Sequence, residues 1–247
     1  IVKYDFGYEI DPVWEAGNKN IPGIYIEFKE PWLNPKGFEQ IVYDVLANTQ
    51  DMNIIEKPEP EDTPFYINNG TINVGNTNGK VILQTFSLES LVRVAEVFQG
   101  KVPMCFLLWK GTGATDLTYD DPLGYASFIN LGVKYKAHFI GPCIAGVPND
   151  YPELDQPWQD YLIHRAKMKN HPYTFDTYDQ MAKYFGQYNF GVADGMFNPP
   201  YLDALFTNHS DMSINYMITH GWRKSPASQT LVDAREVLRK LGYLDNN

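Results

Sequence analysis

Short apolar runs alternate along the chain with segments in which apolar residues recur every three or four positions. The first pattern is typical of strands and the second of amphipathic helices. The runs that predict strands lie at residues 24–29, 81–86, 102–109, 137–144, 171–175 and 191–197. The segments that predict helices lie at residues 34–48, 87–98, 125–131, 158–168 and 231–241, with one more after Asp176. Most strand runs are apolar throughout, as expected for strands covered on both faces, so the alternation predicts a parallel α/β fold.

Several of these elements have recognisable ends. Ser87 and Asp176 each carry a side-chain oxygen that can accept a hydrogen bond from the first turn of a helix, so we expect both to be N-caps. Pro35 fits the start of the helix at 34–48, and Pro31 stops the first strand because proline has no backbone donor.

The first strand run ends in two opposite charges. Side chains alternate between the faces of a strand, so Glu27 and Lys29 point the same way, as does Tyr25 before them. A short strand that ends in paired charges is a candidate edge of a functional site. The alternative is a solvated ion pair on an edge strand.

Two parallel architectures fit the alternation of strands and helices, a doubly wound sheet and a TIM barrel. A doubly wound nucleotide-binding sheet carries a glycine-rich phosphate loop after a strand, and Gly111-Thr112-Gly113 is too short to be one. Charged residues at the carboxyl ends of strands favour the barrel.

Two segments are rich in turn residues and interrupt the regular alternation. We interpret residues 57–80 and 110–136 as loop insertions. Residues 1–202 then form the main part of one domain, and residues 203–247 add a loop and a helix to it.

The composition excludes some classes of protein. The chain has 247 residues, 44% of them apolar, which is enough for a sizeable core. A formal charge of −10 argues against nucleic-acid binding, which needs clustered Lys and Arg. No apolar run approaches the roughly 20 residues that span a membrane. The chain starts with Ile1 rather than Met and shows no signal-peptide pattern, so we expect it to begin inside a longer precursor.

Cysteines and sequons bear on the compartment of the protein. Cys105 and Cys143 lie in apolar runs without metal-ligand spacing, which favours two buried thiols over a disulfide. Asn69 and Asn208 begin two glycosylation sequons in polar segments, which is compatible with a secreted protein.

An ordered set of motifs gives the chain a family resemblance. The motifs are Ile26-Glu27-Phe28-Lys29, Ile82-Leu83-Gln84-Thr85-Phe86, Phe106-Leu107-Leu108, His171-Pro172-Tyr173-Thr174-Phe175 and Asp194-Gly195-Met196-Phe197. In order and approximate spacing they resemble the glycerophosphodiester phosphodiesterase family, in its periplasmic-type branch. The similarity runs from Ile24 to Phe197 and corresponds to the C-terminal two-thirds of that family's barrel.

The resemblance implies a TIM (β/α)8 barrel that hydrolyses glycerophosphodiesters to glycerol 3-phosphate and an alcohol with a divalent cation, Ca²⁺ or Mg²⁺. By match to the motifs, Glu27 looks like a carboxylate ligand of the metal, and Lys29 looks like the residue that holds the phosphate oxygens. Phe86 and Tyr173 would face the glycerol or the alcohol group at the barrel mouth.

The chain also departs from the family pattern. The His-Arg-Gly and His-Asp motifs of the strands that open the family's barrel do not occur here, so both catalytic histidines are missing from this chain. We do not expect His164, His171 or His220 to replace them, and we place His171 before its strand, toward the stability face of a barrel. Asn198-Pro199-Pro200 stands where the family has Thr-Asp.

An incomplete parallel barrel leaves strand edges unpaired. We therefore expect the N-terminal strands to come from elsewhere, and one source is the N-terminal fragment of the same precursor as a second chain. The structure should show either an open side along the first strand, lined by Tyr25 and Glu27, or a second polypeptide that covers it.

Two other functions fit the same motifs. The first is a non-catalytic structural or binding barrel derived from the family, which the missing histidines favour. The second is a phospholipase D-like lyase on the same fold, which would release a cyclic phosphate.

Overall fold

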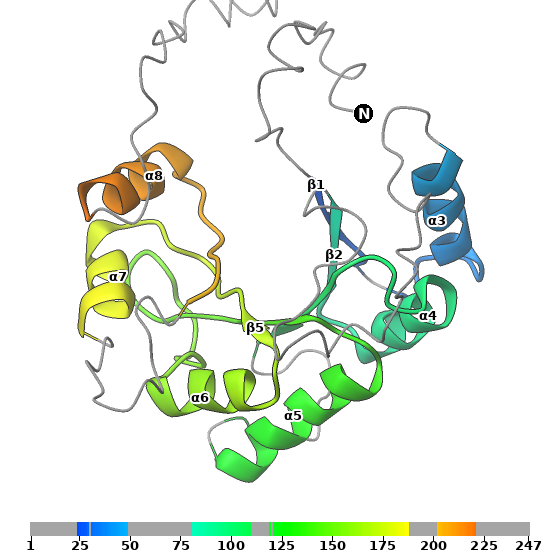
Figure 1. Ribbon diagram of the computed structural model, residues 1–247, viewed down its shortest axis with the longest axis horizontal. Helices are drawn as coiled ribbons and strands as arrows, with labels where there is room; N and C mark the ends of the chain where they lie inside the picture. Colours follow the sequence, from blue (N-terminus) through cyan, green and yellow to red (C-terminus); the bar gives the residue numbers. More distant parts are fainter. Residues whose placement is uncertain are drawn as a thin grey trace, which may run out of the picture. The chain divides into compact units, whose positions relative to one another are not determined.

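A five-stranded parallel sheet forms the centre of the described structure (Figure 1). The structure is a computed structural model, and it describes residues 24–29, 31–48, 81–109, 119, 121–187 and 202–220. The strands are β1 (Ile24–Glu27), β2 (Val81–Thr85), β3 (Met104–Leu108), β4 (Phe139–Pro142) and β5 (Lys169–Asn170). They lie in the order β1-β2-β3-β4-β5, and every neighbouring pair is parallel. The predicted parallel α/β fold is therefore confirmed.

Helices connect the strands, and two more follow the last described strand. They are α3 (Phe38–Asn48), α4 (Leu88–Phe98), α5 (Pro122–Lys134), α6 (Pro157–Arg165), α7 (Tyr178–Ala182) with a π-helical turn at Lys183–Gln187, and α8 (Ser210–Thr219). In Figure 1, α3 to α6 follow one another along the sheet. Within the described residues, no helix combines the length and the apolar character that a membrane crossing requires.

The chain divides into two compact units. One comprises Gly23–Tyr216, and the other comprises Ile1–Pro22 with Met217–Asn247. The sheet lies in the first unit. Residues 203–216, which we assigned to a C-terminal extension, belong to the same unit as the sheet.

Most predicted strands are confirmed, and one lies at a different position in the sequence. The last strand of the sheet is Lys169–Asn170, two residues before the predicted run at 171–175. Both residues of β5 are polar, so a search for apolar runs did not find this strand. Asn170 can nevertheless be buried there, because its amide donates hydrogen bonds to two carboxylates. His171 thus follows its strand, and our placement of it before the strand was wrong. The predicted strand at 191–197 and the predicted helix at 231–241 lie outside the described residues.

The helix starts follow local capping chemistry. Ser87 caps α4 as predicted, and its side chain accepts from Ser90 N at 3.4 Å. The cap of α7 is Thr177 rather than Asp176, because the Thr177 hydroxyl accepts from the backbone N–H of Gln180 at 3.2 Å. The prediction for Asp176 was wrong by one residue.

The second predicted insertion contains a full helix. Asp121 accepts hydrogen bonds from the backbone of Leu123 and Gly124, both at 2.9 Å, and so starts α5 three residues before the helix predicted at 125–131. Residues 122–134 are therefore helical and not loop. The first predicted insertion, residues 57–80, lies outside the described residues.

The two faces of the sheet are both buried, against different partners. Residues such as Leu83, Phe106 and Ile140 pack with the helices in the main core. The alternate residues form a second cluster, in which Cys105, Leu107 and Phe139 are packed by the following side chains: Tyr25, Ile82, Phe86, Tyr173 and Phe206. Strand β3 is buried along its whole length, as its apolar run predicts. Cys105 and Cys143 are buried free thiols, in agreement with the prediction.

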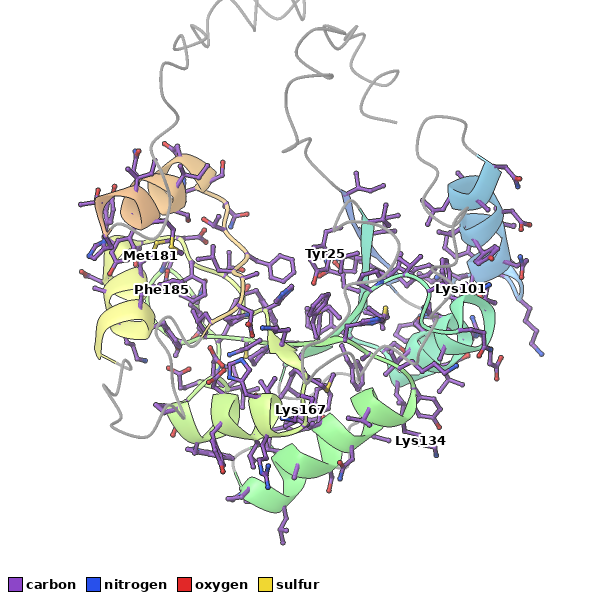
Figure 2. The ribbon with its side chains drawn as sticks, in the orientation of Figure 1. Tyr25, Lys101, Lys134, Lys167, Met181 and Phe185 are labelled. Atoms are coloured by element: carbon purple, nitrogen blue, oxygen red, sulfur yellow. The ribbon has the colours of Figure 1, made fainter. Side chains whose placement is uncertain are left out.

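The sheet is curled, and the second cluster fills its concave face. A hydrogen bond of 3.1 Å joins the Tyr25 hydroxyl on β1 to His171 Nδ1, which follows β5. In a flat sheet the first and fifth strands are about 19 Å apart, and side chains on one face stand parallel to each other. The contact therefore requires that the sheet bends around its inner face. Figure 2 shows Tyr25 on the inner side of the curve, with Lys134 and Lys167 toward the outer helices.

Residues 203–206 form a loop, as expected, and this loop is hydrogen-bonded to β5 and to the segment that follows β5. Asp203 N donates to Asn170 O at 3.1 Å, Phe206 N donates to Pro172 O at 3.0 Å, and Phe175 N donates to Phe206 O at 2.8 Å. The ring of Phe206 then meets that of Tyr25, with centroids 4.8 Å apart.

The first strand is an edge strand of the described sheet. Among the described strands β1 pairs with β2 alone, and these strands do not form a closed eight-stranded barrel. This agrees with an open side along β1. Tyr25, however, does not line that side, because a side chain stands perpendicular to the sheet while the open edge lies in its plane. The Tyr25 side chain packs on the concave face instead.

A buried polar network fixes α6 to β5. Asn170 Nδ2 donates to Asp155 at 2.8 Å and to Asp160 at 2.9 Å, and His164 lies between Asp160 (3.2 Å) and Asp203 (2.7 Å). Burial raises the pKa of Asp155 and Asp160. Burial alone would lower the pKa of His164, but its hydrogen bonds to the two carboxylates raise that pKa to about 10. His164 is thus an imidazolium at neutral pH.

The concave face has no room for a side chain at Gly141 of β4. A Cβ there would lie 2.6 Å from Leu107 Cδ2, 2.9 Å from Cys105 Sγ and 3.1 Å from the backbone oxygen of His171. We expect Gly141→Ala to lower the free energy of unfolding by about 2 kcal/mol, measured by urea denaturation, because overpacking forces the strands apart. Gly132→Ala is the matched control, since its Cβ meets only movable side-chain ends at 3.2 Å or more. If both substitutions lowered the free energy of unfolding equally, the close packing around Gly141 on the inner face would be refuted.

His164 should make stability depend on alkaline pH. Its pKa in the folded protein, about 10, lies above its ordinary value of 6.5, so its stabilisation is complete below about pH 6.5 and is lost as the pH rises to about 10. We expect His164→Gln to cost about 2 kcal/mol at pH 6 and almost nothing at pH 10, measured by urea denaturation of both proteins. The exposed His209→Gln is the control. A cost of His164→Gln that is constant with pH would refute the charged network.

Candidate functional site

A cavity of about 250 Å³ opens on the concave face at the carboxyl ends of the strands. It is lined by Glu27, Gln84, Phe86, Leu107, Tyr173, Thr174, Phe206, Thr207 and Asn208. Parallel α/β proteins bind their ligands at this end of the sheet, because the loops that follow the strands converge there. The cavity is therefore the candidate functional site.

Strand register explains how residues far apart in the sequence meet in the cavity. Glu27, the last residue of β1, is the direct partner of Gln84 on β2, and Gln84 is the partner of Cys105 on β3. Alternation places Phe86 and Leu107, two residues further along, on the same face. Because alternate side chains of a strand point to opposite faces, Glu27, Gln84, Phe86 and Leu107 all point toward the concave face.

Three of the four site residues expected from the sequence line the cavity. Glu27, Phe86 and Tyr173 come from β1, from the end of β2 and from the segment after β5. The rings of Phe86 and Tyr173 are in edge-to-face contact, with centroids 5.7 Å apart. Lys29 does not line the cavity: its Nζ lies 3.4 Å from Glu27 Oε1, and its side chain is 71% exposed. The structure thus brings the expected residues together, while their roles stay predictions.

Tyr173 is a fixed wall of the cavity. Its hydroxyl donates to Leu108 O at 3.0 Å, and its ring also contacts Tyr151. Burial raises the pKa of Tyr173, so the phenol stays neutral at physiological pH. The residue is suited to pack a carbon skeleton rather than to transfer a proton.

The thiol below the cavity is not a nucleophile. Burial raises the pKa of Cys105 to about 12, so the reactive thiolate is not populated at neutral pH. Burial also raises the pKa of Cys143 to about 12.

The segment 206–208 forms a wall of the cavity that the sequence analysis did not find. Asp176 holds it in place: its Oδ1 accepts from Asn208 N at 2.9 Å, and its Oδ2 accepts from Asn208 Nδ2 at 3.0 Å. The only signal in the sequence was the sequon at Asn208, which pointed to glycosylation and not to a site. The other sequon, at Asn69, lies outside the described residues.

The charge of the cavity comes from a single carboxylate. Among its lining residues Glu27 is the only acidic one, and the described residues contain no group of three or more His, Cys, Asp or Glu that could hold a metal ion. Ca²⁺ and Mg²⁺ take six or more oxygen ligands, and several of these are often waters or substrate oxygens. Glu27 is the carboxylate that the described lining offers to such an ion, and its role as a metal ligand stays a prediction.

None of the five histidines is among the lining residues of the cavity. His171 is the nearest in the fold: it stacks on Phe139 with ring centroids 4.0 Å apart and bonds to Tyr25. Burial lowers its pKa to about 4, so it is neutral and part of the inner core. His138 accepts a hydrogen bond from Met104 N at 3.0 Å, and burial lowers its pKa as well.

Two comparisons with known proteins found no relative of this chain. No protein-family model matches the chain, and the search of curated proteins finds no match either. The function must therefore be argued from the motifs and from the geometry of the cavity.

The clamp between Asp176 and Asn208 gives a direct test of how the cavity wall is held. We expect Asn208→Asp to lower the free energy of unfolding by about 1 kcal/mol at pH 7, because two carboxylates then face each other where a hydrogen bond of 3.0 Å now lies. The loss should shrink at pH 4, where one of the two carboxylates is protonated. Thermal unfolding at both pH values measures this, with Asn208→Ala as the control that removes the bond without adding a charge. Equal stability of Asn208→Asp and the unchanged protein at pH 7 would refute the clamp.

Proposed function

We propose that this chain forms part of a TIM-barrel phosphodiesterase that hydrolyses glycerophosphodiesters to glycerol 3-phosphate and an alcohol. The observation that carries the proposal is the cavity itself. It gathers Glu27, Phe86 and Tyr173 at the carboxyl ends of parallel strands, with Lys29 next to Glu27. These are the four residues that the family motifs single out, and their separation in the sequence does not by itself bring Phe86 and Tyr173 to Glu27.

The curled sheet supports the barrel in this proposal. The strand order follows the sequence without a reversal, whereas a doubly wound sheet changes direction at a switch point. The hydrogen bond between Tyr25 and His171 closes the concave face across the strands. The edge of β1 that no described strand covers is then where the remaining barrel strands would pair, and an N-terminal fragment of a longer precursor is their proposed source.

The residue types fit phosphodiester chemistry. A divalent cation, Ca²⁺ or Mg²⁺, is part of the proposal, with Glu27 as one oxygen ligand and the others from outside the described residues. The Lys29 ammonium would stabilise negative charge on the phosphate oxygens. Its present ion pair with Glu27 is exposed, and such pairs contribute little, so Lys29 can turn toward a substrate at little cost.

The alcohol side of the substrate would lie against aromatic rings. Phe86, Tyr173 and Phe206 line the cavity, and Phe206 is held from below by Tyr25. Flat apolar rings pack a carbon skeleton without competing for its hydroxyl groups. The acid and base groups of the reaction would come from the N-terminal strands, because no histidine lines this part of the cavity.

One observation favours a second function, a barrel that binds a ligand without turning it over. The described cavity lining has one carboxylate and no histidine, so neither of the two histidines that the family uses for proton transfer is among the described lining residues. In this case the same four residues would bind the phosphodiester, and the precursor would not cleave it.

The exposed sequon supports a secreted or periplasmic location. Asn208 is at the surface, where a glycosylation acceptor must be. We include this location in the proposal.

We expect the precursor to hydrolyse glycerophosphocholine and to lose this activity with a chelator. Glu27→Gln should abolish turnover, and Lys29→Ala should lower kcat by a factor of about 10², the scale of one lost charge partner in the transition state. Release of glycerol 3-phosphate measures the rate, and phosphorus NMR would show a cyclic phosphate if the enzyme is a lyase.

Two exposed positions provide matched controls for charge. Glu96→Gln on α4 and Lys36→Ala before α3 make the same chemical changes away from the cavity, and both should keep full activity. Activity that survives both the chelator and Glu27→Gln would overturn the proposed role of Glu27. Binding of glycerophosphocholine without hydrolysis would favour the non-catalytic barrel.

A further inference from the structure

Gln84 lines the cavity and carries a buried oxygen, Oε1, for which the described protein offers no hydrogen-bond partner. It lies beside Glu27 in the strand register. Buried polar atoms in folded proteins almost always have a partner, so an exception calls for a physical reason.

The cost of this arrangement argues against a purely structural role. A buried acceptor without a partner loses its hydration and gains nothing in return. Phe86 and Leu107, which line the cavity next to Gln84, are apolar, so an apolar side chain would fit the same surface. The chain nevertheless has a carboxamide at this position.

We infer that the Gln84 carboxamide binds a hydroxyl group of the ligand. A carboxamide has both a donor and an acceptor, and a hydroxyl group can satisfy both. A phosphate oxygen would engage only the donor and would leave Oε1 without a partner. A quaternary ammonium group would engage neither by a hydrogen bond.

The side chain can present either end of its amide to the cavity. The terminal torsion of glutamine is broad and roughly two-fold, so a rotation exchanges the positions of oxygen and nitrogen without moving the backbone. Thr207 and Asn208 line the same cavity and add further neutral polar groups. The region around Gln84 therefore takes the polyol part of a ligand, while the phosphate lies toward Glu27 and Lys29. This assignment rests on the proposed function and adds the part of the substrate that Gln84 recognises.

The test compares two phosphates that differ in hydroxyl groups. Isothermal titration calorimetry with glycerol 3-phosphate and with ethyl phosphate measures the preference for the polyol, because the two anions carry the same charged group. We expect the unchanged protein to bind glycerol 3-phosphate about tenfold more tightly, the equivalent of one hydrogen bond. In Gln84→Met this preference should vanish, while the affinity for ethyl phosphate stays the same.

Stability gives a second readout that does not depend on a ligand. Gln84→Met replaces the unpartnered amide with an apolar side chain of similar length, so its Tm should rise by about 3 °C. Gln40→Met, on the exposed side of α3, is the control and should change neither Tm nor the preference. A fall in Tm for Gln84→Met would show that the amide has a structural partner and would overturn the inference.

A second variant keeps the test decisive if Gln84→Met does not fold. Gln84→Asn keeps the amide but withdraws it by one carbon, so the preference for glycerol 3-phosphate should also fall. An unchanged preference in either variant would refute the role of Gln84 even if the precursor hydrolyses diesters. A preference that depends on Gln84 in a precursor without hydrolysis would support the inference and refute the proposed enzyme.

Discussion

The contact between Tyr25 and His171 is the constraint on which the inner half of the molecule depends. It joins the first strand to the segment after the fifth at 3.1 Å, and this distance is possible only if the sheet curls. Because the sheet curls, side chains on the inner face of one strand pack against inner side chains of the other strands and not against helices. Tyr25, Phe139 and Phe206 can then be buried against one another, and the carboxyl ends of the strands converge on one cavity.

The same alternation of side chains connects stability with the site. Outward residues such as Leu83 and Phe106 pack against the helices, and inward residues such as Cys105 fill the concave face below the cavity. Polar residues begin where this inner packing ends, at Glu27 and Gln84. The floor of the cavity is thus apolar, and its polar groups lie above that floor.

The buried network at the other end of the sheet has a different character. Asn170 and the carboxylates of Asp155 and Asp160 take the place of apolar residues, and His164 balances their charge between α6 and the segment at Asp203. Such networks fix one arrangement of the elements that share them, because each member depends on the geometry of the others. The network therefore holds β5 and the segment beside it in register, although neither has a long apolar strand.

The sequence by itself determined the parallel α/β fold, the common direction of Tyr25 and Glu27 on the first strand and the cap at Ser87, because these depend on local periodicity and on short-range hydrogen bonds. It also indicated Glu27, Phe86 and Tyr173 as site residues through their motifs. It could not find β5 at Lys169, since the burial of polar Asn170 depends on carboxylates that fold against it. The cavity wall at 206–208 and the unpartnered amide of Gln84 were decided only by the tertiary structure. Both arise where the curled sheet brings distant segments together, and no local pattern records such contacts.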